Sequence, residues 1–275
     1  AEAEPLYRES LAIREKLLGK DHPSYLSSLN NLSRVVRVQG KLSEAESMLR
    51  DVLRESRRVL KDDHPSTTLA MNELAALLAE DLKQYSEAAS LHREALERRR
   101  RTMAEDDIDT LQSTQNLGRL LTLVGKYAEA EPLLRRAIEG RQKVLGENHR
   151  HTLSSMNSLS LVYEAQGQFA EAEPLLARLC TPAGLAVWPA GSHPVFFQRW
   201  GCCLTRLGRY TDAEAPLLRA HEMLRAANRD KTEFMRQVLE ALVEVLDHTN
   251  RPEEASHCRS ELAKISTATA PTTSP

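Results

Sequence analysis

The stretch QNLGRLLTLVGKYAEAEPLLRRAIEGRQKVLGENH, from Gln115 to His149, predicts two amphipathic helices joined by a short turn. Its first half places apolar residues at i, i+3, i+4 and i+7 from Leu117, and its second half repeats this spacing from Ala130. Between them, Gly125 can adopt the left-handed backbone conformation that ends a helix. The stretch is therefore a predicted helical hairpin, in which the small residues Gly118 and Ala130 mark a close crossing of the two helices.

The hairpin recurs along the chain. The small residue of the second helix returns every 41 to 43 residues, at Ala45, Ala88, Ala130, Ala172, Ala213 and Ala255. In five copies a residue that tolerates left-handed backbone stands five positions earlier, namely Gly40, Gly125, Gly167, Gly208 and Asn250. A single hairpin cannot bury its apolar faces, whereas stacked copies share one core. The sequence thus predicts an all-α solenoid of antiparallel helical hairpins.

The order of residues within each copy resembles the tetratricopeptide repeat: a small residue, a large residue, a Gly turn, an aromatic residue, the Ala and then a Leu. The period of about 42 residues exceeds the usual period of about 34. With the Asn pair in SLNNL, the EAEPLLRRA-type second helix and the LGKDHPS link, the chain resembles the long-repeat subfamily found in kinesin light chains. The resemblance spans Glu2 to Lys264 and implies a right-handed superhelix.

The copies predict one tetratricopeptide array over residues 1–265. The chain opens on a second helix, residues 1–23, without an initiator methionine, and we expect a piece of a longer protein. Complete repeats are expected at about 24–65, 66–109, 110–151, 152–193, 194–231 and 232–265. Residues 266–275 are Ser, Thr, Ala and Pro alone, which predicts a disordered tail.

Composition and motifs exclude several classes of function. The formal charge is -2, and the basic run at 97–101 ends a predicted helix, where cations meet the carbonyl dipole, so no nucleic-acid partner is expected. No apolar run reaches the 18 residues that a membrane-spanning helix requires, so no membrane partner is expected either. The motifs GxGxxG, HExxH, GxSxG and the P-loop are missing, so we expect neither an enzyme nor a cofactor.

The histidines and cysteines are predicted to be structural. Equivalent link histidines of adjacent repeats should lie about 10 Å apart, whereas zinc needs each nitrogen near 2 Å, so His22, His64, His149 and His151 predict no metal site. The same links are expected to cap the next helix with Ser or Thr. Cys180, Cys202, Cys203 and Cys258 show no CxxC spacing and predict reduced thiols in a cytoplasmic protein.

The repeat pattern is interrupted once, between Thr181 and Pro194. Pro182 and Gly184 are predicted to end the second helix of the fourth copy early and to start a loop that carries Trp188. Two interpretations stay open. Either the loop covers core that the short helix leaves exposed, or Trp188 contacts a partner protein.

The concave groove implied by the resemblance supplies the candidate binding site. The positions fifteen and fourteen before each repeat Ala would face it, and they are rich in amides, which can pair with the backbone of an extended peptide. In the related family an Asn here grips peptide backbone, a role that carries over to Asn30, Asn72 and Asn157, with Gln115 a near match. The candidate residues are Asn30, Asn31, Arg34, Arg37, Asn72, Gln115, Asn116, Arg119 and Asn157.

The groove residues and the function of the whole chain each allow more than one interpretation. The amides either bind peptide or are polar residues tolerated on a solvated face, and the arginines favour acidic ligands. The leading functional prediction is a non-catalytic scaffold or adaptor that holds an extended peptide or short helix of a partner protein. The alternatives are a sensor or autoinhibitory arm of a larger signalling or ATPase protein and a structural spacer. The oligomeric state is left open.

Overall fold

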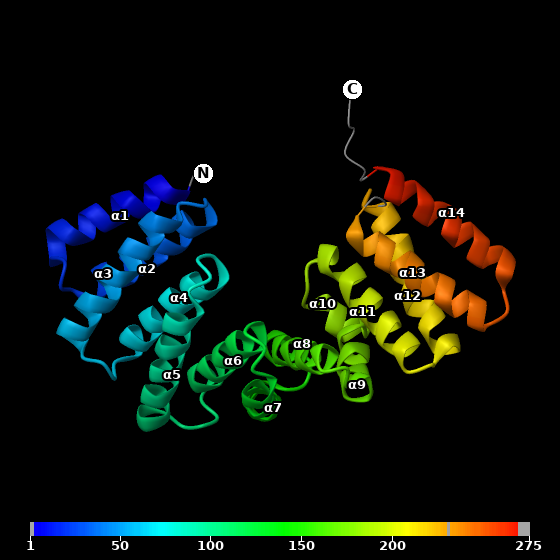
Figure 1. The fold of residues 1–275 in the computed structure, drawn as a ribbon. Coiled ribbons are helices and arrows are strands. Elements are labelled where there is room, and N and C mark those ends of the chain that lie inside the picture. The colour runs from blue at the N-terminus through cyan, green and yellow to red at the C-terminus, as the bar shows by residue number, and fades with distance from the viewer. Residues whose placement is uncertain (1–2, 230–231, 269–275) are drawn as a thin grey trace. The chain divides into compact units, whose positions relative to one another are not determined.

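Every regular element in the computed structural model, which describes residues 3–229 and 232–268, is a helix (Figure 1). This confirms the all-α prediction. In chain order the elements are α1 Ala3–Leu18, α2 Pro23–Val38, α3 Leu42–Leu60, α4 Pro65–Glu80, α5 Tyr85–Thr102, α6 Ile108–Leu123, α7 Tyr127–Leu145, α8 Arg150–Ala165, α9 Phe169–Leu179, α10 Pro182–Ala186, the 3-10 helix η1 Ala190–Ser192, α11 His193–Arg206, α12 Tyr210–Ala226, α13 Glu233–His248 and α14 Pro252–Ala268.

The contacts between helices divide the chain into two compact units, Ala1–Val144 and Leu145–Pro275. In the first unit each helix from α1 to α5 packs on the next one along the chain. The helices α6 and α7 cross where predicted, because a Cβ added to Gly118 would lie 2.8 Å from Leu134 Cγ and 3.5 Å from the Ala130 carbonyl oxygen. First helices of successive hairpins also touch, α2 with α4 and α4 with α6, so this unit grows lengthwise.

The second unit is built in the same way. Here α8 packs on α9, α9 on α11, and α11 to α14 each on the next helix. Its core consists mainly of Leu, Val and Ala side chains around Leu204, Leu217 and Leu242, which are almost fully buried. The prediction of a single array over 1–265 stays a prediction. Of the predicted tail, residues 269–275 lie outside the described residues, whereas α14 continues as far as Ala268.

The turns inside the hairpins use left-handed backbone as predicted. Positive φ angles between 58° and 79° occur at Gly40, Gly125, Gly167, Gly208 and Asn250. In the second copy, which has no Gly at this place, Lys83 adopts a φ of 59°. These residues end the first helix so that the chain can reverse into the second.

The expected Ser or Thr caps in three links are wrong, because a histidine is the N-cap. The Nδ1 atoms of His22, His64 and His149 accept the backbone N–H two residues on, at 3.1, 3.1 and 3.2 Å. The hydroxyls of Thr67 and Thr152 instead donate backward to link carbonyls, each at 2.8 Å. Each imidazole thus satisfies a helix N–H that has no partner within its own helix.

The loop predicted between Thr181 and Pro194 is largely helical, which corrects that prediction. Pro182 is the first residue of α10, a position that suits proline because its missing N–H is not needed there. The Thr181 hydroxyl caps this helix by accepting the Gly184 N–H at 3.1 Å. A sequence that breaks one helix therefore starts another, shorter one.

Candidate functional site

The first helices of the first unit turn one row of side chains toward solvent, which we call the first-helix face. Its members recur at a spacing close to the repeat period and are exposed or half-buried. They are Asn31, Arg34 and Val38 on α2, Leu69, Glu73, Ala76 and Glu80 on α4, and Gln112, Asn116, Arg119 and Leu123 on α6.

The amides fifteen residues before each repeat Ala lie under this face instead of on it. Asn30 and Asn72 are each 6% exposed and Gln115 is 3% exposed, so the expectation that they face an open groove is wrong. One step along a helix turns a side chain by about 100°, which places Asn31 and Asn116 outward and their neighbours inward. A peptide-binding role for the candidate residues stays a prediction.

Asn72 belongs to a buried polar network between α4, α5 and α6. Its Oδ1 lies 2.8 Å from His92 Nδ1, and its Nδ2 donates to Ser113 Oγ at 2.9 Å. Burial lowers the pKa of His92 to about 4, and the positive charge of Arg119 adds to this effect. The imidazole is therefore neutral near pH 7, and its Nδ1–H can serve as the donor to Asn72.

Buried arginines extend the network from one repeat to the next. Arg99 on α5 donates to Thr68 on α4 at 3.2 Å, to Ser113 on α6 at 3.0 Å, and to the carbonyl of Asp109, the second residue of α6. Arg14 on α1 makes the equivalent bond, at 2.9 Å, to the carbonyl of Ser24, the second residue of α2. We call this bond the arginine latch.

Arg141 holds the same repeat position in α7 and is fully buried. It donates to Gln115 Oε1 and, at 2.8 Å, to Gln112 Oε1, so both glutamines of α6 are occupied within the protein. Burial lowers the pKa of Arg141 to about 10, which leaves the guanidinium charged near pH 7.

The first complete repeat lacks both kinds of support. Leu49 stands where α5 has His92, and Ser56 stands where α5 has Arg99. As a result, the buried Asn30 Oδ1 and Ser56 Oγ have no hydrogen-bond partner among the described residues. The 42-residue period of the sequence shows that these two positions differ between the repeats. Only the structure shows that the positions are buried, so that a missing partner leaves a polar atom without a hydrogen bond.

Two of the four charged side chains of the first-helix face, Glu80 and Arg119, are paired, and Arg37 beside the face takes part in the same cluster. Arg37 donates to Asp81 Oδ2 at 2.6 Å and to Glu80 Oε2 at 2.7 Å, and Arg119 donates to Glu80 Oε1 at 3.0 Å. Burial alone would raise the pKa of Glu80, but these two arginines lower it. Arg37 and Arg119 therefore do not provide the unpaired positive charges that an acidic ligand was expected to meet.

In the second unit, Asn157 is also occupied. Its Oδ1 accepts from Arg199 on α11 at 2.6 Å, and the same guanidinium donates to Ser160 at 2.7 Å and pairs with Glu164. Arg199 thus joins α8 to α11 through one half-buried side chain.

Trp188 is half-buried between α10 and η1. Its ring centroid lies 5.4 Å from that of Phe196, and its Nε1 is buried without a hydrogen-bond partner among the described residues. His193 Nε2 lies 3.0 Å from the carbonyl oxygen of Leu185 and 3.2 Å from that of Trp188, which holds the segment on α11. The packing supports the covering role, and a partner contact for Trp188 stays a prediction.

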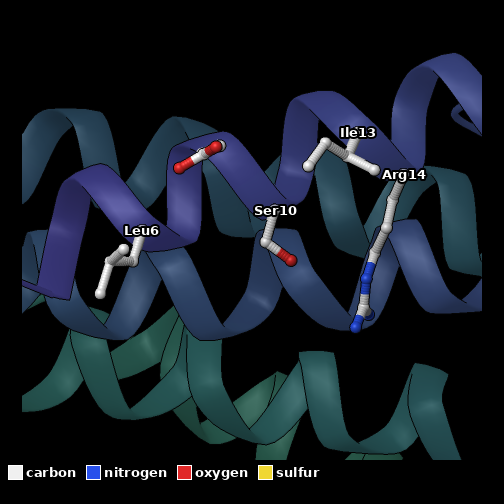
Figure 2. A pocket seen from close by; sticks show the side chains of 5 residues that line it. Leu6, Ser10, Ile13 and Arg14 are labelled. Atoms are coloured by element: carbon white, nitrogen blue, oxygen red, sulfur yellow. The ribbon is translucent and has the colours of Figure 1, made fainter.

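A pocket of about 270 Å³ lies along α1, where Leu6, Glu9, Ser10, Ile13 and Arg14 line it (Figure 2). Leu6 is 67% exposed and Ile13 is 51% exposed. In the second repeat, the residues at the positions of Leu6 and Ser10 are Leu91 and Ala95, which are buried. In the second repeat, this face of the second helix is packed against the first helix, α4.

The described residues form neither a reactive thiol site nor a metal site. Burial raises the pKa of the Cys180 and Cys203 thiols to about 12 and that of Cys202 to about 11, and all four cysteines are unpaired. Within residues 3–229 and 232–268, no three His, Cys, Asp or Glu side chains are arranged to hold a metal ion. No helix in the same ranges has the length and apolar character needed to cross a bilayer.

Comparisons with known proteins agree with this architecture. The tetratricopeptide repeat family model matches residues 1–54, 37–101, 66–143 and 107–181. No curated protein sequence matches the chain.

Solved structures with similar folds include proteins related to kinesin light chains. The nearly identical repeats of a kinesin light chain-like protein of Podosopora anserina share 25% identity with a TM-score of 0.65, and cover 76% of this chain and 98% of that one. BtubC (BKLC) of P. vanneervenii shares 20% identity with a TM-score of 0.70, over 82% and 91% of the two chains. PilF of Pseudomonas aeruginosa, at 16% identity and a TM-score of 0.61, covers 87% of this chain and 91% of its own.

The family model covers more than half of the chain, and its overlapping matches extend from α1 to α9. The similarity to the Podosopora anserina repeats agrees with the kinesin-light-chain-like type that the links and the Asn pair indicated. The chain is a member of the tetratricopeptide repeat family, of the kinesin-light-chain-like type.

Proposed function

We propose that this protein is a non-catalytic interaction scaffold whose first-helix face binds an extended peptide or short helix of a partner protein. Tetratricopeptide repeats serve protein interaction in general, and the fold is typically non-catalytic. The mixture of exposed apolar, charged and amide side chains on the first-helix face supports this proposal.

The distribution of exposed apolar side chains carries the proposal. Val38 on α2 is 88% exposed, Leu69 on α4 is 45% exposed and Leu123 on α6 is 53% exposed, although each helix also has a well-buried side. On α3 and α5, the described residues include no exposed large apolar side chain, and their outward surfaces carry ion pairs such as Arg50 with Glu87. Exposed apolar side chains among polar ones are typical of a binding surface, because a peptide that covers them removes apolar area from water.

The compartment is proposed from the cysteines. All four are free thiols, and a reducing environment keeps them so. We therefore place the protein in the cytoplasm, where a peptide segment of another cytoplasmic protein would be the partner.

The test uses a displayed library of random 12-residue peptides selected on the whole chain, followed by titration of the enriched peptides. Leu69→Glu with Leu123→Glu should weaken binding about tenfold or more, because burying a leucine contributes about 1.5 to 3 kcal/mol. Arg93→Ala, on the outward side of α5, is the matched control and should leave affinity unchanged. Circular dichroism checks that both variants keep the helical fold. Equal weakening by both variants, or none by either, would remove the first-helix face as the binding surface.

A further inference from the structure

Most polar side chains of the first-helix face are already paired within the first unit. Glu80 is shared by Arg37 and Arg119, and Gln112 accepts from Arg141 while it donates to Asn116 Oδ1 at 2.8 Å. A ligand would have to break such contacts before it could use these groups. They therefore contribute little to selecting one peptide over another.

One region of the face is different. Asn31 and Arg34 on α2 and Glu73 on α4 form no hydrogen bond through their side chains and no ion pair with any described residue. Asn31 and Arg34 are exposed, Glu73 is half-buried, and α2 contacts α4 directly. Beneath them lies Asn30, whose buried amide oxygen has no donor. The unpaired groups of the first-helix face thus gather at α2 and α4.

These groups have defined chemical requirements. An unpaired guanidinium at Arg34 attracts a carboxylate, and an unpaired carboxylate at Glu73 attracts an ammonium or guanidinium. The Asn31 amide offers a donor and an acceptor to a peptide backbone. Adjacent packed helices lie about 10 Å apart, which an extended chain spans in about three residues at roughly 3.3 Å each.

Resting on the proposed function, we propose that α2 and α4 select an extended peptide that carries an acidic and a basic side chain about three residues apart. The acidic side chain pairs with Arg34 and the basic one with Glu73, which fixes the direction of the peptide along the face. Val38 lies one helical turn after Arg34, Leu69 lies one turn before Glu73, and both are exposed, so they receive apolar side chains of the same peptide.

The chain provides a matched control for Arg34. Arg119 occupies the same position of the repeat, eleven residues before the repeat Ala, but it is paired with Glu80 at 3.0 Å. Removing Arg119 leaves Glu80 paired with Arg37 at 2.7 Å. Arg34→Gln and Arg119→Gln thus differ in whether an unpaired charge is lost.

The first experiment repeats the library selection on the parent chain and on the double charge swap Arg34→Glu with Glu73→Arg. The parent should enrich peptides with an acidic residue and a basic residue separated by about three positions. The swapped chain should enrich the opposite order of charges along the same apolar pattern. Enriched peptides without paired charges, or the same order from both chains, would overturn the proposal.

The second experiment titrates one enriched peptide and its copy with the acidic residue replaced by Gln, at low and at high salt. Arg34→Gln should lower the affinity for the charged peptide about two- to fivefold at low salt, the range for an exposed ion pair. It should not affect the Gln copy, and Arg119→Gln should change neither. A similar loss from both arginine variants would contradict selection by Arg34.

The two proposals fail in different ways. If enriched peptides lack a charge pattern but lose binding in the Leu69→Glu, Leu123→Glu variant, the first-helix face still binds peptides and the charge rule is wrong. If the parent chain enriches no peptide at all, both the proposed function and the charge rule are overturned.

Discussion

At the scale of single residues, His92 makes the stability of the first unit depend on pH. Burial lowers its pKa to about 4, whereas an unfolded chain restores a value near 6.5. Below pH 6.5 the unfolded state therefore binds a proton that the folded state does not. The stabilisation is fully present above pH 6.5 and is lost as the pH falls toward 4.

We predict that lowering the pH from 7 to 5 destabilises the parent chain by about 2 kcal/mol more than the His92→Leu variant. Leu is the natural replacement, because Leu49 and Leu134 occupy this position in the neighbouring repeats. Urea denaturation at both pH values measures the difference. Equal pH dependence in the two proteins would mean that His92 is protonated in the folded state or does not report on folding.

The second residue-scale prediction compares a buried amide, Asn72, with an exposed one, Asn31. Asn72→Ala removes the partner of both His92 and Ser113 in a buried network, so it should destabilise the chain by about 1 to 3 kcal/mol. Asn31→Ala removes an exposed amide with no partner and should leave stability unchanged. Urea midpoints that shift equally would contradict the burial of Asn72.

The sequence identified these amides correctly as a recurring feature but assigned their direction wrongly. The period located Asn30, Asn72 and Gln115 in equivalent places, yet a helix turns by about 100° per residue, so two consecutive residues that were both placed in the groove differ, one being buried and the other turned toward solvent. The arginines Arg99 and Arg141 recur 42 residues apart and carried a signal. Arginine is rarely buried without partners, and those partners lie on other helices, which periodicity alone does not reveal.

At the scale of helices, the histidine caps give a direct test. His64→Ala should destabilise the chain by about 0.5 to 2 kcal/mol, because the Ser66 N–H at the start of α4 loses its acceptor. His64→Asn keeps a capping side chain and should recover most of the loss. Ser66→Ala should have little effect on the urea midpoint, since the Ser66 hydroxyl is not the cap. A larger loss from Ser66→Ala would restore serine as the capping residue.

The α9–α10 junction gives the second element-scale prediction. A Cβ on Gly184 would lie 2.5 Å from the Arg178 carbonyl oxygen and 2.6 Å from that of Leu179, and backbone atoms cannot move aside as a side chain can. Gly184→Ala should therefore destabilise the chain by about 1 to 3 kcal/mol. Gly191→Ala, with no atom within 4 Å of its Cβ, is the control. Equal thermal midpoints for both variants would contradict the packing of α10 on α9.

The helices show where local sequence rules succeed and where they do not. Glycines at fixed places and Leu–Ala periodicity predicted the hairpins, because these features act within a few residues. Pro182 was interpreted as a breaker, since proline ends the helix that precedes it, but the same residue starts α10. Which of these two roles applies depends on whether Thr181 caps the new helix, which is a local contact, and on whether Gly184 fits against α9, which is a packing contact between two helices.

At the scale of the whole molecule, two sets of contacts join successive repeats of the first unit. On the outward surface, Arg8 pairs with Glu44, Arg50 with Glu87 and Arg93 with Glu129, in step with the repeat. All of these side chains are well exposed, and exposed ion pairs contribute about 0 to 1 kcal/mol each. Inside, Arg99 bonds α5 to α4 through Thr68, and to α6 through Ser113 and the arginine latch. The buried contact should therefore couple the repeats more strongly than the outward pairs.

In a repeat protein the sharpness of unfolding depends on the interfaces between neighbours. Arg99→Met keeps a long apolar side chain but removes the donor for Thr68, Ser113 and the Asp109 carbonyl. We expect a loss of about 1 to 3 kcal/mol and a smaller slope of unfolding free energy against urea, because the repeats on either side of α5 then unfold less together. Arg50→Gln, which removes an outward pair, should shift the midpoint by less than about 1 kcal/mol and keep the slope. A slope that is unchanged in Arg99→Met but reduced in Arg50→Gln would assign the coupling to the surface ion pairs instead of the latch.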